Sequence, residues 1–192
     1  VPRMREIGEH IVSAGGKRMR PALLMLICRA LGYEGELHRY LGATIELLHT
    51  ATLMHDDVVD ESAVRRGKPT ANALWGNGVA VLVGDFLYTR SFQMMIRAGN
   101  LRVMRALADA ANTLAEGEVK QMVNAHDPTV DEKRYFEVIE RKTACLFEAG
   151  AKMAAAIADC SEKDEAAVRE YALALGNAFQ IVDDMLDYTG VS

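Results

Sequence analysis

Three aspartates, Asp56, Asp57 and Asp60, stand within the segment IELLHTATLMHDDVVDESAVRRGK at positions 45–68. Asp56 and Asp60 are four residues apart, so on a helix they share one face and lie one turn apart. Such carboxylates repel one another unless a cation lies between them. Oxygen donors without a nearby cysteine suit Mg²⁺, which binds a few carboxylates together with substrate phosphate and water. The block predicts a magnesium site, although a solvated acidic helix end would have the same composition.

A second block with the same spacing occurs near the end of the sequence, at Asp183, Asp184 and Asp187. It again interrupts an apolar helical run, FQIVDDMLD at 179–187. Two such blocks can face each other across a cavity in a helical bundle and share a cluster of Mg²⁺. The repeat makes this interpretation far more specific than either block alone.

Basic residues occur in two places that suit a polyphosphate. Arg65 and Arg66 follow the first acidic block, and Lys17, Arg18 and Arg20 lie in GGKRMRP at 15–21. Paired glycines and a proline mark the start of a helix there, and a helix N-terminus favours anions. The sequence thus predicts an anion site at 15–21, with a solubilising basic turn as the simpler alternative.

The composition predicts an all-α fold that positions these groups. Half of the 192 residues are apolar, which is enough for one domain with a substantial core. Only four prolines occur, and alternation typical of strands is scarce. The net charge of −5 argues against general nucleic-acid binding. Three scattered cysteines and the lack of a long uncharged apolar run favour a soluble, cytoplasmic protein without a membrane span.

The apolar periodicity predicts a series of helices with short connections. They cover 1–14, 21–31, 36–60, 79–98, 101–125, 129–159 and 161–188, and 61–77 is expected to be a loop that places Arg65, Arg66 and Lys68 over the cavity mouth. Asn100, Thr129 with Glu132, and Ser161 with Asp164 are the expected N-terminal caps. Since the sequence starts at Val1 and stops soon after the second block, we expect a partial domain, cut at both ends.

Taken together, these motifs resemble the trans-prenyltransferases of the polyprenyl diphosphate synthase family, closest to the long-chain, octaprenyl-type enzymes of quinone biosynthesis. The resemblance covers essentially all 192 residues. It rests on GGKRMRP at 15–21, ELLHTATLMHDDVVDESAVRRGKPTAN at 46–72, GDFLYTRSF at 84–92, EGEVKQM at 116–122, RKTACLF at 141–147 and GNAFQIVDDMLDYTG at 176–190. It implies one catalytic domain, 1–192, of the isoprenoid-synthase type of helical bundle with a central cavity, without the family's N-terminal helix and C-terminal helices.

The resemblance also implies a role for each group of residues. The catalytic residues would be Asp56, Asp57, Asp60, Lys142 and Asp183, and all six aspartates, Asp56, Asp57, Asp60, Asp183, Asp184 and Asp187, would hold about three Mg²⁺ ions. Arg65, Lys142, Thr143 and Gln180 would bind the allylic diphosphate. Lys17, Arg20, His49 and Arg66 would bind isopentenyl diphosphate. The implied reaction joins the two head to tail, repeatedly, in a homodimeric enzyme that makes an all-trans polyprenyl diphosphate from a farnesyl or geranyl primer.

Product length is partly readable from two positions. In the family, bulky aromatic residues four or five places before the first block stop elongation at short products. Ala51 and Thr52 occupy these places here, and both are small. This favours a long product, with a farnesyl- or geranylgeranyl-type synthase as the alternative.

Other functions fit the residues less well. A terpene cyclase or head-to-head synthase has no reason to carry GGKRMRP. The doublet His55-Asp56 would suit an HD phosphohydrolase, but the other histidines are poorly placed as ligands. A non-catalytic subunit of a heteromeric synthase would be expected to lose aspartates from one block, whereas this sequence keeps all six.

Overall fold

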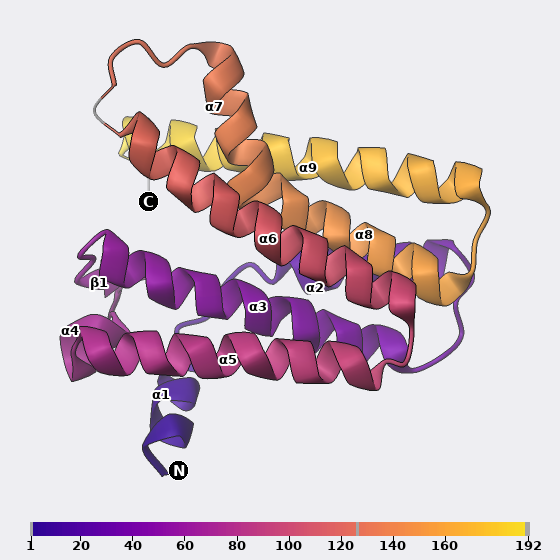
Figure 1. Cartoon of the computed structure of the whole chain (residues 1–192), viewed down its shortest axis with the longest axis horizontal. Coiled ribbons are helices and arrows are strands. Elements are labelled where there is room, and N and C mark those ends of the chain that lie inside the picture. Colours follow the sequence, from indigo (N-terminus) through magenta and orange to yellow (C-terminus); the bar gives the residue numbers. More distant parts are fainter. Residues whose placement is uncertain (1, 126, 191–192) are drawn as a thin grey trace.

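The computed structural model describes residues 2–125 and 127–190, without the side chains of residues 2, 3, 5 and 12. It is a helical bundle, which confirms the predicted all-α fold (Figure 1). Its elements are α1 (Pro2–Ser13), α2 (Met19–Ala30), α3 (Leu37–Val59), β1 (Val64–Arg65), β2 (Lys68–Pro69), α4 (Ala71–Trp75), α5 (Asn77–Arg97), α6 (Leu101–Asn124), α7 (Glu132–Ile139), the π-helix η1 (Glu140–Ala144), α8 (Cys145–Ala158) and α9 (Glu162–Thr189).

Helix α8 forms the centre of the bundle and packs against α2, α3, α6 and α9. Its sequence, CLFEAGAKMAAAIA, is apolar almost all round, which is typical of a buried helix. Leu146, Phe147 and Met153 are at most 1% exposed, and small alanines let the neighbouring backbones approach. Leu24, Ile45 and Leu107 from the surrounding helices complete this core.

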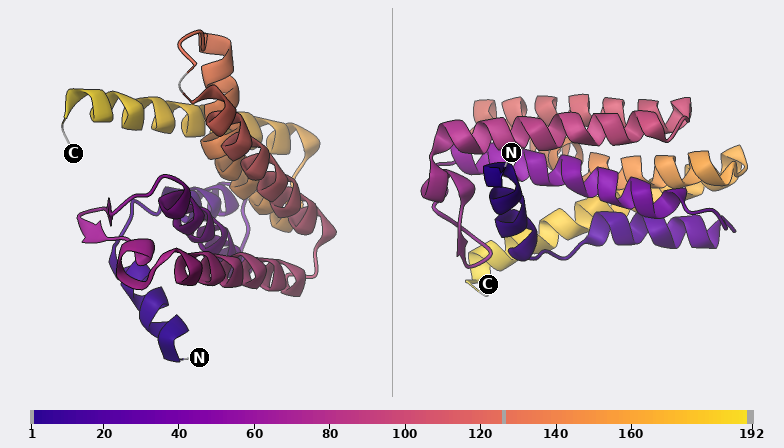
Figure 2. Two further views of the ribbon diagram at one scale, coloured as in Figure 1. Left: turned by 60° about the vertical axis from the view of Figure 1, so that its left-hand side comes forward. Right: turned by 90° about the horizontal axis from the view of Figure 1, so that it is seen from below.

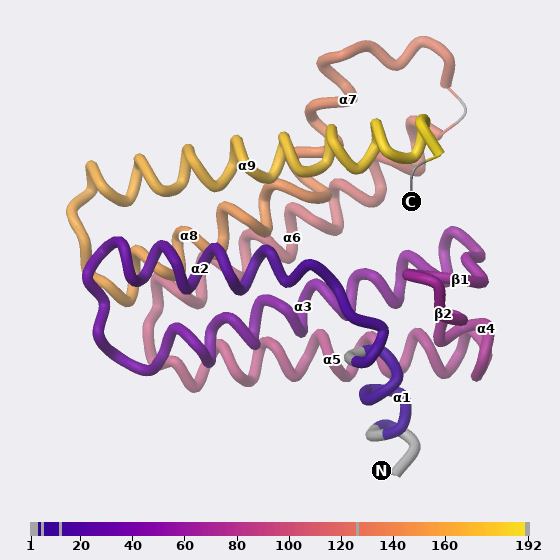
Figure 3. The backbone as a smooth tube through the Cα atoms, turned by 180° about the vertical axis from the view of Figure 1, so that it is seen from behind, coloured from indigo at the N-terminus to yellow at the C-terminus, as the bar shows by residue number. Residues whose placement is uncertain are grey.

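Several helices place their ends together at one end of the bundle. Figures 1 and 3, which view the molecule from opposite sides, show the start of α2 and the final turns of α3, α6 and α9 there, with α7 beside them. Helix α1 projects from the bundle in the left view of Figure 2 and lies across this end of it in the right view. Its Ile7 is buried in a second apolar cluster with Met54 of α3 and Ala80 of α5. Sequence-distant segments therefore meet at this end.

The helix predictions are confirmed within a few residues, with three differences. The single helix predicted at 129–159 is α7, η1 and α8, with the π-helical turn between two α-helices. The predicted loop 61–77 contains an antiparallel hairpin, β1–β2, and the short helix α4. The predicted cap at Thr129 is wrong, because Asp131 caps α7 by accepting from Arg134 N at 2.8 Å. The predicted caps Asn100 and Ser161 are confirmed, since both side chains accept from the first turns of α6 and α9.

Within the described ranges, 2–125 and 127–190, no helix combines the length and the apolar character needed to cross a membrane.

Candidate active site

A cavity of about 1130 Å³ lies at the end of the bundle where these segments meet. It brings together thirteen of the fourteen predicted site residues, namely Lys17, Arg20, His49, Asp56, Asp60, Arg65, Arg66, Lys142, Thr143, Gln180, Asp183, Asp184 and Asp187. The remaining one, Asp57, lines a smaller pocket of about 50 Å³ between α1, α3 and the hairpin. The two acidic blocks, on α3 and α9, therefore share one cavity with the basic residues of 17–20 and 65–66.

In the first acidic block Asp56 and Asp57 are covered by protein, whereas Asp60 is exposed. The side chain of Asp56 is 13% exposed and lies 3.9 Å, Oδ2 to Nζ, from Lys142. Burial raises the pKa of Asp56 to about 6; Lys142 lowers this pKa and Glu118 raises it further. Asp57 turns the other way and accepts from Arg65 Nε at 2.7 Å. Burial also raises the pKa of Asp57, while the hydrogen bond from Arg65 opposes this.

The second acidic block is held by partners from two other segments and by one from α9 itself. Asp183 Oδ1 lies 2.8 Å from Lys17 Nζ, which links α9 to the loop before α2. Asp184 uses both carboxylate oxygens: Oδ2 accepts from the hydroxyl of Tyr135 at 2.6 Å, and Oδ1 accepts from Gln180 Nε2 at 2.8 Å. Asp187 is exposed at the cavity. This block thus depends on long-range polar contacts more than on burial.

The π-helix η1 carries Lys142 and Thr143 into the cavity wall. Lys142 Nζ donates to Glu118 Oε2 at 2.9 Å, and Thr143 donates to Gln180 Oε1 at 2.7 Å. Glu118 belongs to α6 and Gln180 to α9, so η1 is tied to a helix on either side. A cation and a hydroxyl thereby reach the space between the acidic blocks.

The basic side of the cavity contains an arginine that lacks part of its hydrogen bonding. Arg20 contacts His49 Nε2 through NH1 at 3.1 Å and lies 4.8 Å above the Phe147 ring. Its buried Nε has no hydrogen-bond partner among the described residues. Burial lowers the pKa of Arg20 to about 10, and burial with nearby arginines lowers the pKa of His49 well below its ordinary value. An anion bound in the cavity beside Arg20 would offset the desolvation of its charge.

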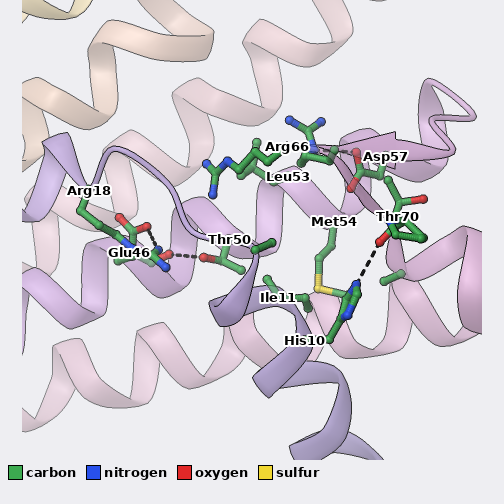
Figure 4. Close-up of a pocket in the computed structure, with 14 residues that line it drawn as sticks. His10, Ile11, Arg18, Glu46, Thr50, Leu53, Met54, Asp57, Arg66 and Thr70 are labelled. Carbon is green, nitrogen blue, oxygen red and sulfur yellow. Dashed lines mark hydrogen bonds and ion pairs between the residues drawn. The ribbon is translucent and has the colours of Figure 1, made fainter. Parts of the chain in front are cut away.

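Two arginines of this cluster adopt left-handed backbone conformations, Arg18 at φ 50° and Arg66 at φ 52°. Arg18 forms an ion pair with Glu46, and Arg66 NH1 donates to Gly15 O. Figure 4 shows the Arg18–Glu46 pair at one end of the smaller pocket and Asp57 towards the other. A left-handed residue other than glycine is uncommon, so both conformations are maintained by their surroundings.

Lys68 does not reach the cavity mouth, contrary to the prediction. Its Nζ donates to Ser13 O at 2.8 Å, and His10 Nε2 lies 2.9 Å from Pro69 O. These contacts connect the hairpin to α1, so Lys68 supports the arrangement of the hairpin instead of lining the site.

The donor set fits magnesium in chemistry, without a preformed cluster. Among the described residues, no three His, Cys, Asp or Glu side chains gather closely enough to form a metal site. Five aspartates nevertheless line the cavity and offer the carboxylate oxygens that Mg²⁺ prefers. Mg²⁺ also retains water and substrate phosphate ligands, so a complete all-protein cage is not needed.

The structure adds residues that the sequence did not single out as site residues. Glu118 and Tyr135 line the cavity and bind Lys142 and Asp184, and Glu46 lies beside the arginines. Their positions depend on contacts between distant elements. Glu46 and Glu118 lie within the motifs at 46–72 and 116–122, and Tyr135 lies outside all the quoted motifs.

Comparison with known proteins gives consistent matches. A family profile described as Polyprenyl synthetase matches residues 1–192. An octaprenyl diphosphate synthase of Escherichia coli (strain K12) is 52% identical over 185 residues, which cover 96% of this chain and 57% of the relative. The chain therefore spans little more than half the length of this curated relative.

Solved structures match equally well. The crystal structure of a decaprenyl diphosphate synthase from Rhodobacter capsulatus has a TM-score of 0.95 and 52% identity, covering 97% of this chain and 57% of that one. A polyprenyl synthase from Caulobacter crescentus CB15, complexed with calcium and isoprenyl diphosphate, has a TM-score of 0.94 and 43% identity, with 96% and 56% covered.

Proposed function

Because the chain belongs to the polyprenyl synthetase family, we propose that the protein is a long-chain trans-polyprenyl diphosphate synthase. It would join an allylic diphosphate to isopentenyl diphosphate, head to tail, and repeat this addition. The observation that carries the proposal is that two acidic blocks and the basic cluster, distant in sequence, line one cavity. Octaprenyl and decaprenyl diphosphate synthases among the similar proteins support a long product.

The basic side of the cavity suits isopentenyl diphosphate. Lys17, Arg20, His49 and Arg66 would hold its diphosphate, and a bound anion would offset the desolvation of the Arg20 charge. The lowered pKa of His49 favours a neutral imidazole, which binds through a hydrogen bond and adds no charge. These contacts would orient the double bond of isopentenyl diphosphate towards the allylic carbon.

The acidic side suits the allylic diphosphate. Lys142 and Thr143, with Gln180 and Arg65, would contact its headgroup. Carboxylates of Asp56, Asp60, Asp183, Asp184 and Asp187 would hold Mg²⁺, and Asp57 would join them only on release from Arg65. Mg²⁺, when bound, supplies Lewis-acid neutralisation of the leaving diphosphate. Lys142 would replace its contact with Glu118 by one with the diphosphate, which adds positive charge where negative charge develops.

The two substrates supply all the atoms and electrons of the proposed reaction. The C–O bond of the allylic diphosphate breaks, and its electron pair leaves with pyrophosphate. The isopentenyl double bond attacks the allylic carbon to form the new C–C bond. Loss of a proton, with the departing pyrophosphate as the proposed acceptor, restores an alkene. The chain's part is to orient both substrates and to exclude water from the allylic cation.

The chain-length proposal rests on the side chains that precede the first block. Thr52 lines the cavity and donates to His49 O at 2.8 Å, while Ala51 is fully buried in the core. Neither blocks a growing chain as an aromatic side chain would. We further propose a cytoplasmic homodimer that supplies quinone side chains, on the strength of the family resemblance.

The test uses the full-length protein with farnesyl diphosphate, labelled isopentenyl diphosphate and Mg²⁺, followed by sizing of the extracted chains. We expect a metal-dependent ladder that ends at octaprenyl length and is absent from Asp56→Ala. A ladder ending at farnesyl or geranylgeranyl length would indicate a short-chain synthase. Pyrophosphate release without elongation would contradict the proposal in favour of a cyclase or hydrolase, and no turnover would favour a non-catalytic subunit.

A further inference from the structure

Two glycines stand where helices α6 and α9 meet the π-helical turn η1. Gly117 lies inside α6 and Gly176 inside α9, and both are buried. Glycine is the poorest helix former after proline, so two buried glycines in helix interiors call for a packing reason. The turn that they contact, Glu140–Ala144, carries Lys142 and Thr143.

The packing reason is the backbone of η1 itself. A Cβ added to Gly117 would lie 2.9 Å from Arg141 Cβ and 3.0 Å from Lys142 N. A Cβ added to Gly176 would lie 2.6 Å from Ala144 Cα and 2.8 Å from Ala144 Cβ. These separations are shorter than an ordinary van der Waals contact of a Cβ atom. The atoms approached are backbone atoms or Cβ atoms, which cannot move away by a side-chain rotation. The side chain at both positions must therefore be hydrogen.

The same two helices also bind the side chains that η1 presents. Glu118 follows Gly117 on α6 and accepts from Lys142 Nζ at 2.9 Å. Gln180 lies one turn after Gly176 on α9 and accepts from Thr143 at 2.7 Å. Each helix thus contributes a glycine that receives the backbone of η1 and a polar residue that receives one of its side chains. π-Helical turns are rare and occur frequently at functional sites.

We propose that Gly117 and Gly176 are positioning residues, which seat η1 between α6 and α9 so that Lys142 and Thr143 reach the cavity. A methyl group at either position would push η1 away from that helix. Lys142 and Thr143 would then move together, because both belong to the one turn. The effect on substrate binding rests on the proposed function, and it concerns the allylic side of the cavity.

The first experiment needs no turnover. Backbone-amide hydrogen exchange is measured in the full-length protein and in Gly117→Ala, Gly176→Ala and Gly150→Ala. Gly150 is the matched control, because it is a buried glycine on α8 where an added Cβ would meet Ile45 Cδ1 at 3.4 Å, an ordinary contact. We expect exchange across 140–144 to accelerate at least tenfold in the first two variants and to remain unchanged in Gly150→Ala.

The second experiment measures KM for farnesyl diphosphate and for isopentenyl diphosphate. We expect Gly117→Ala and Gly176→Ala to raise the KM for farnesyl diphosphate about tenfold, with the KM for isopentenyl diphosphate within about twofold of wild type. A variant that is merely less stable would lose active protein and leave both KM values unchanged.

Three outcomes overturn the proposal. Exchange that accelerates throughout the molecule, or not at all, would show that the glycines do not act on η1. Exchange that accelerates at 140–144 without a change in either KM would show that the seat of η1 does not position the binding groups. A wild-type protein without turnover would contradict the proposed function, while the exchange measurement would still decide whether the glycines seat η1.

Discussion

The two acidic blocks share one spacing and one cavity, yet the protein surrounds them differently. At the end of α3, the side chains of Asp56 and Asp57 are only 13% and 9% exposed. In α9 the side chain of Asp183, which corresponds to Asp56, is 36% exposed. The third aspartate of each block, Asp60 and Asp187, is exposed in both. The carboxylates of α3 face desolvation, whereas Asp183 and Asp184 are bound by side chains from distant elements.

This difference shows that the burial and the charged partners of a carboxylate depend on the surrounding fold and not on the DDxxD motif alone. Burial of the Asp56 and Asp57 carboxylates costs free energy, and a bound cation can offset this cost. The second block is connected to Lys17, Tyr135 and Gln180, and those contacts can be exchanged for contacts with substrate or metal. We therefore expect the two blocks to respond differently to the same substitution.

The largest expected difference is in turnover. Asp56→Asn should lower kcat about 10³-fold, roughly 4 kcal/mol of transition-state stabilisation, whereas Asp187→Asn should lower it about tenfold. Asp56 is only 13% exposed, and its replacement by an amide would leave Lys142 without a charged partner on α3, whereas Asp187 is exposed. Single-turnover kinetics of the full-length protein would measure both, and equal losses would remove the distinction between the covered and the exposed aspartate.

The next effect concerns stability against pH without metal. The pKa of folded Asp56, about 6, exceeds its ordinary value of 3.8, so the native state holds this proton more tightly than the unfolded state does. The Asp56 contribution to stability is thus fully present below about pH 4 and is lost as pH rises through about 6. At about pH 7.5 the charged form should cost about 2–3 kcal/mol, so Asp56→Asn should melt higher than wild type in EDTA.

The measurement for this prediction is thermal unfolding in EDTA near pH 4 and near pH 7.5. The advantage of Asp56→Asn should shrink towards the lower pH. Added Mg²⁺ should reverse the order at the higher pH, because only the wild type gains from binding. A constant difference across pH would contradict the role of Asp56 ionisation.

A smaller effect should separate the two ion pairs. Arg65→Met leaves Asp57 covered without its partner and should lower the free energy of unfolding by about 2 kcal/mol, less than for a fully buried pair because Arg65 is 35% exposed. The control Lys17→Met breaks a pair with 61% and 36% exposed side chains and should cost less than about 0.5 kcal/mol. Urea unfolding in EDTA would measure both, and a larger loss in Lys17→Met would refute the comparison.

The smallest effect concerns Tyr135. Tyr135→Phe removes one hydrogen bond to Asp184 Oδ2, while Gln180 still holds Oδ1. The concentration of Mg²⁺ for half-maximal activity should rise about threefold to fivefold, roughly 1 kcal/mol, with kcat nearly unchanged. Tyr188→Phe, at a tyrosine that is 93% exposed, is the control. A loss of kcat in Tyr135→Phe with an unchanged Mg²⁺ requirement would contradict a positioning role for this hydroxyl.

Much of the fold and most of the site could be predicted because they follow local patterns. Helical periodicity located α3 and α9, and the acidic and basic motifs pointed to one cavity. The cap at Thr129 could not be predicted, because Asp127 captures both Thr129 N and its hydroxyl, at 2.9 and 2.6 Å, and leaves Asp131 as the cap.

The remaining features depend on contacts that no local pattern encodes. The π-helical turn lies against Gly117 and Gly176, which are distant in sequence, and the strands of the hairpin are only two residues each. The orientation of Asp57 away from the cavity follows from the position of Arg65 on that hairpin. Such features become visible only when the elements are assembled.

The left-handed backbone at Arg18 and Arg66 has a consequence for protein engineering. Each conformation costs on the order of 1 kcal/mol for a residue with a Cβ, and glycine would avoid most of it. A library selected only for thermal stability should therefore enrich glycine at 18 and 66 and remove two guanidinium groups from the cavity lining. Selection for thermal stability would favour glycine at these two positions, whereas selection for turnover would favour arginine.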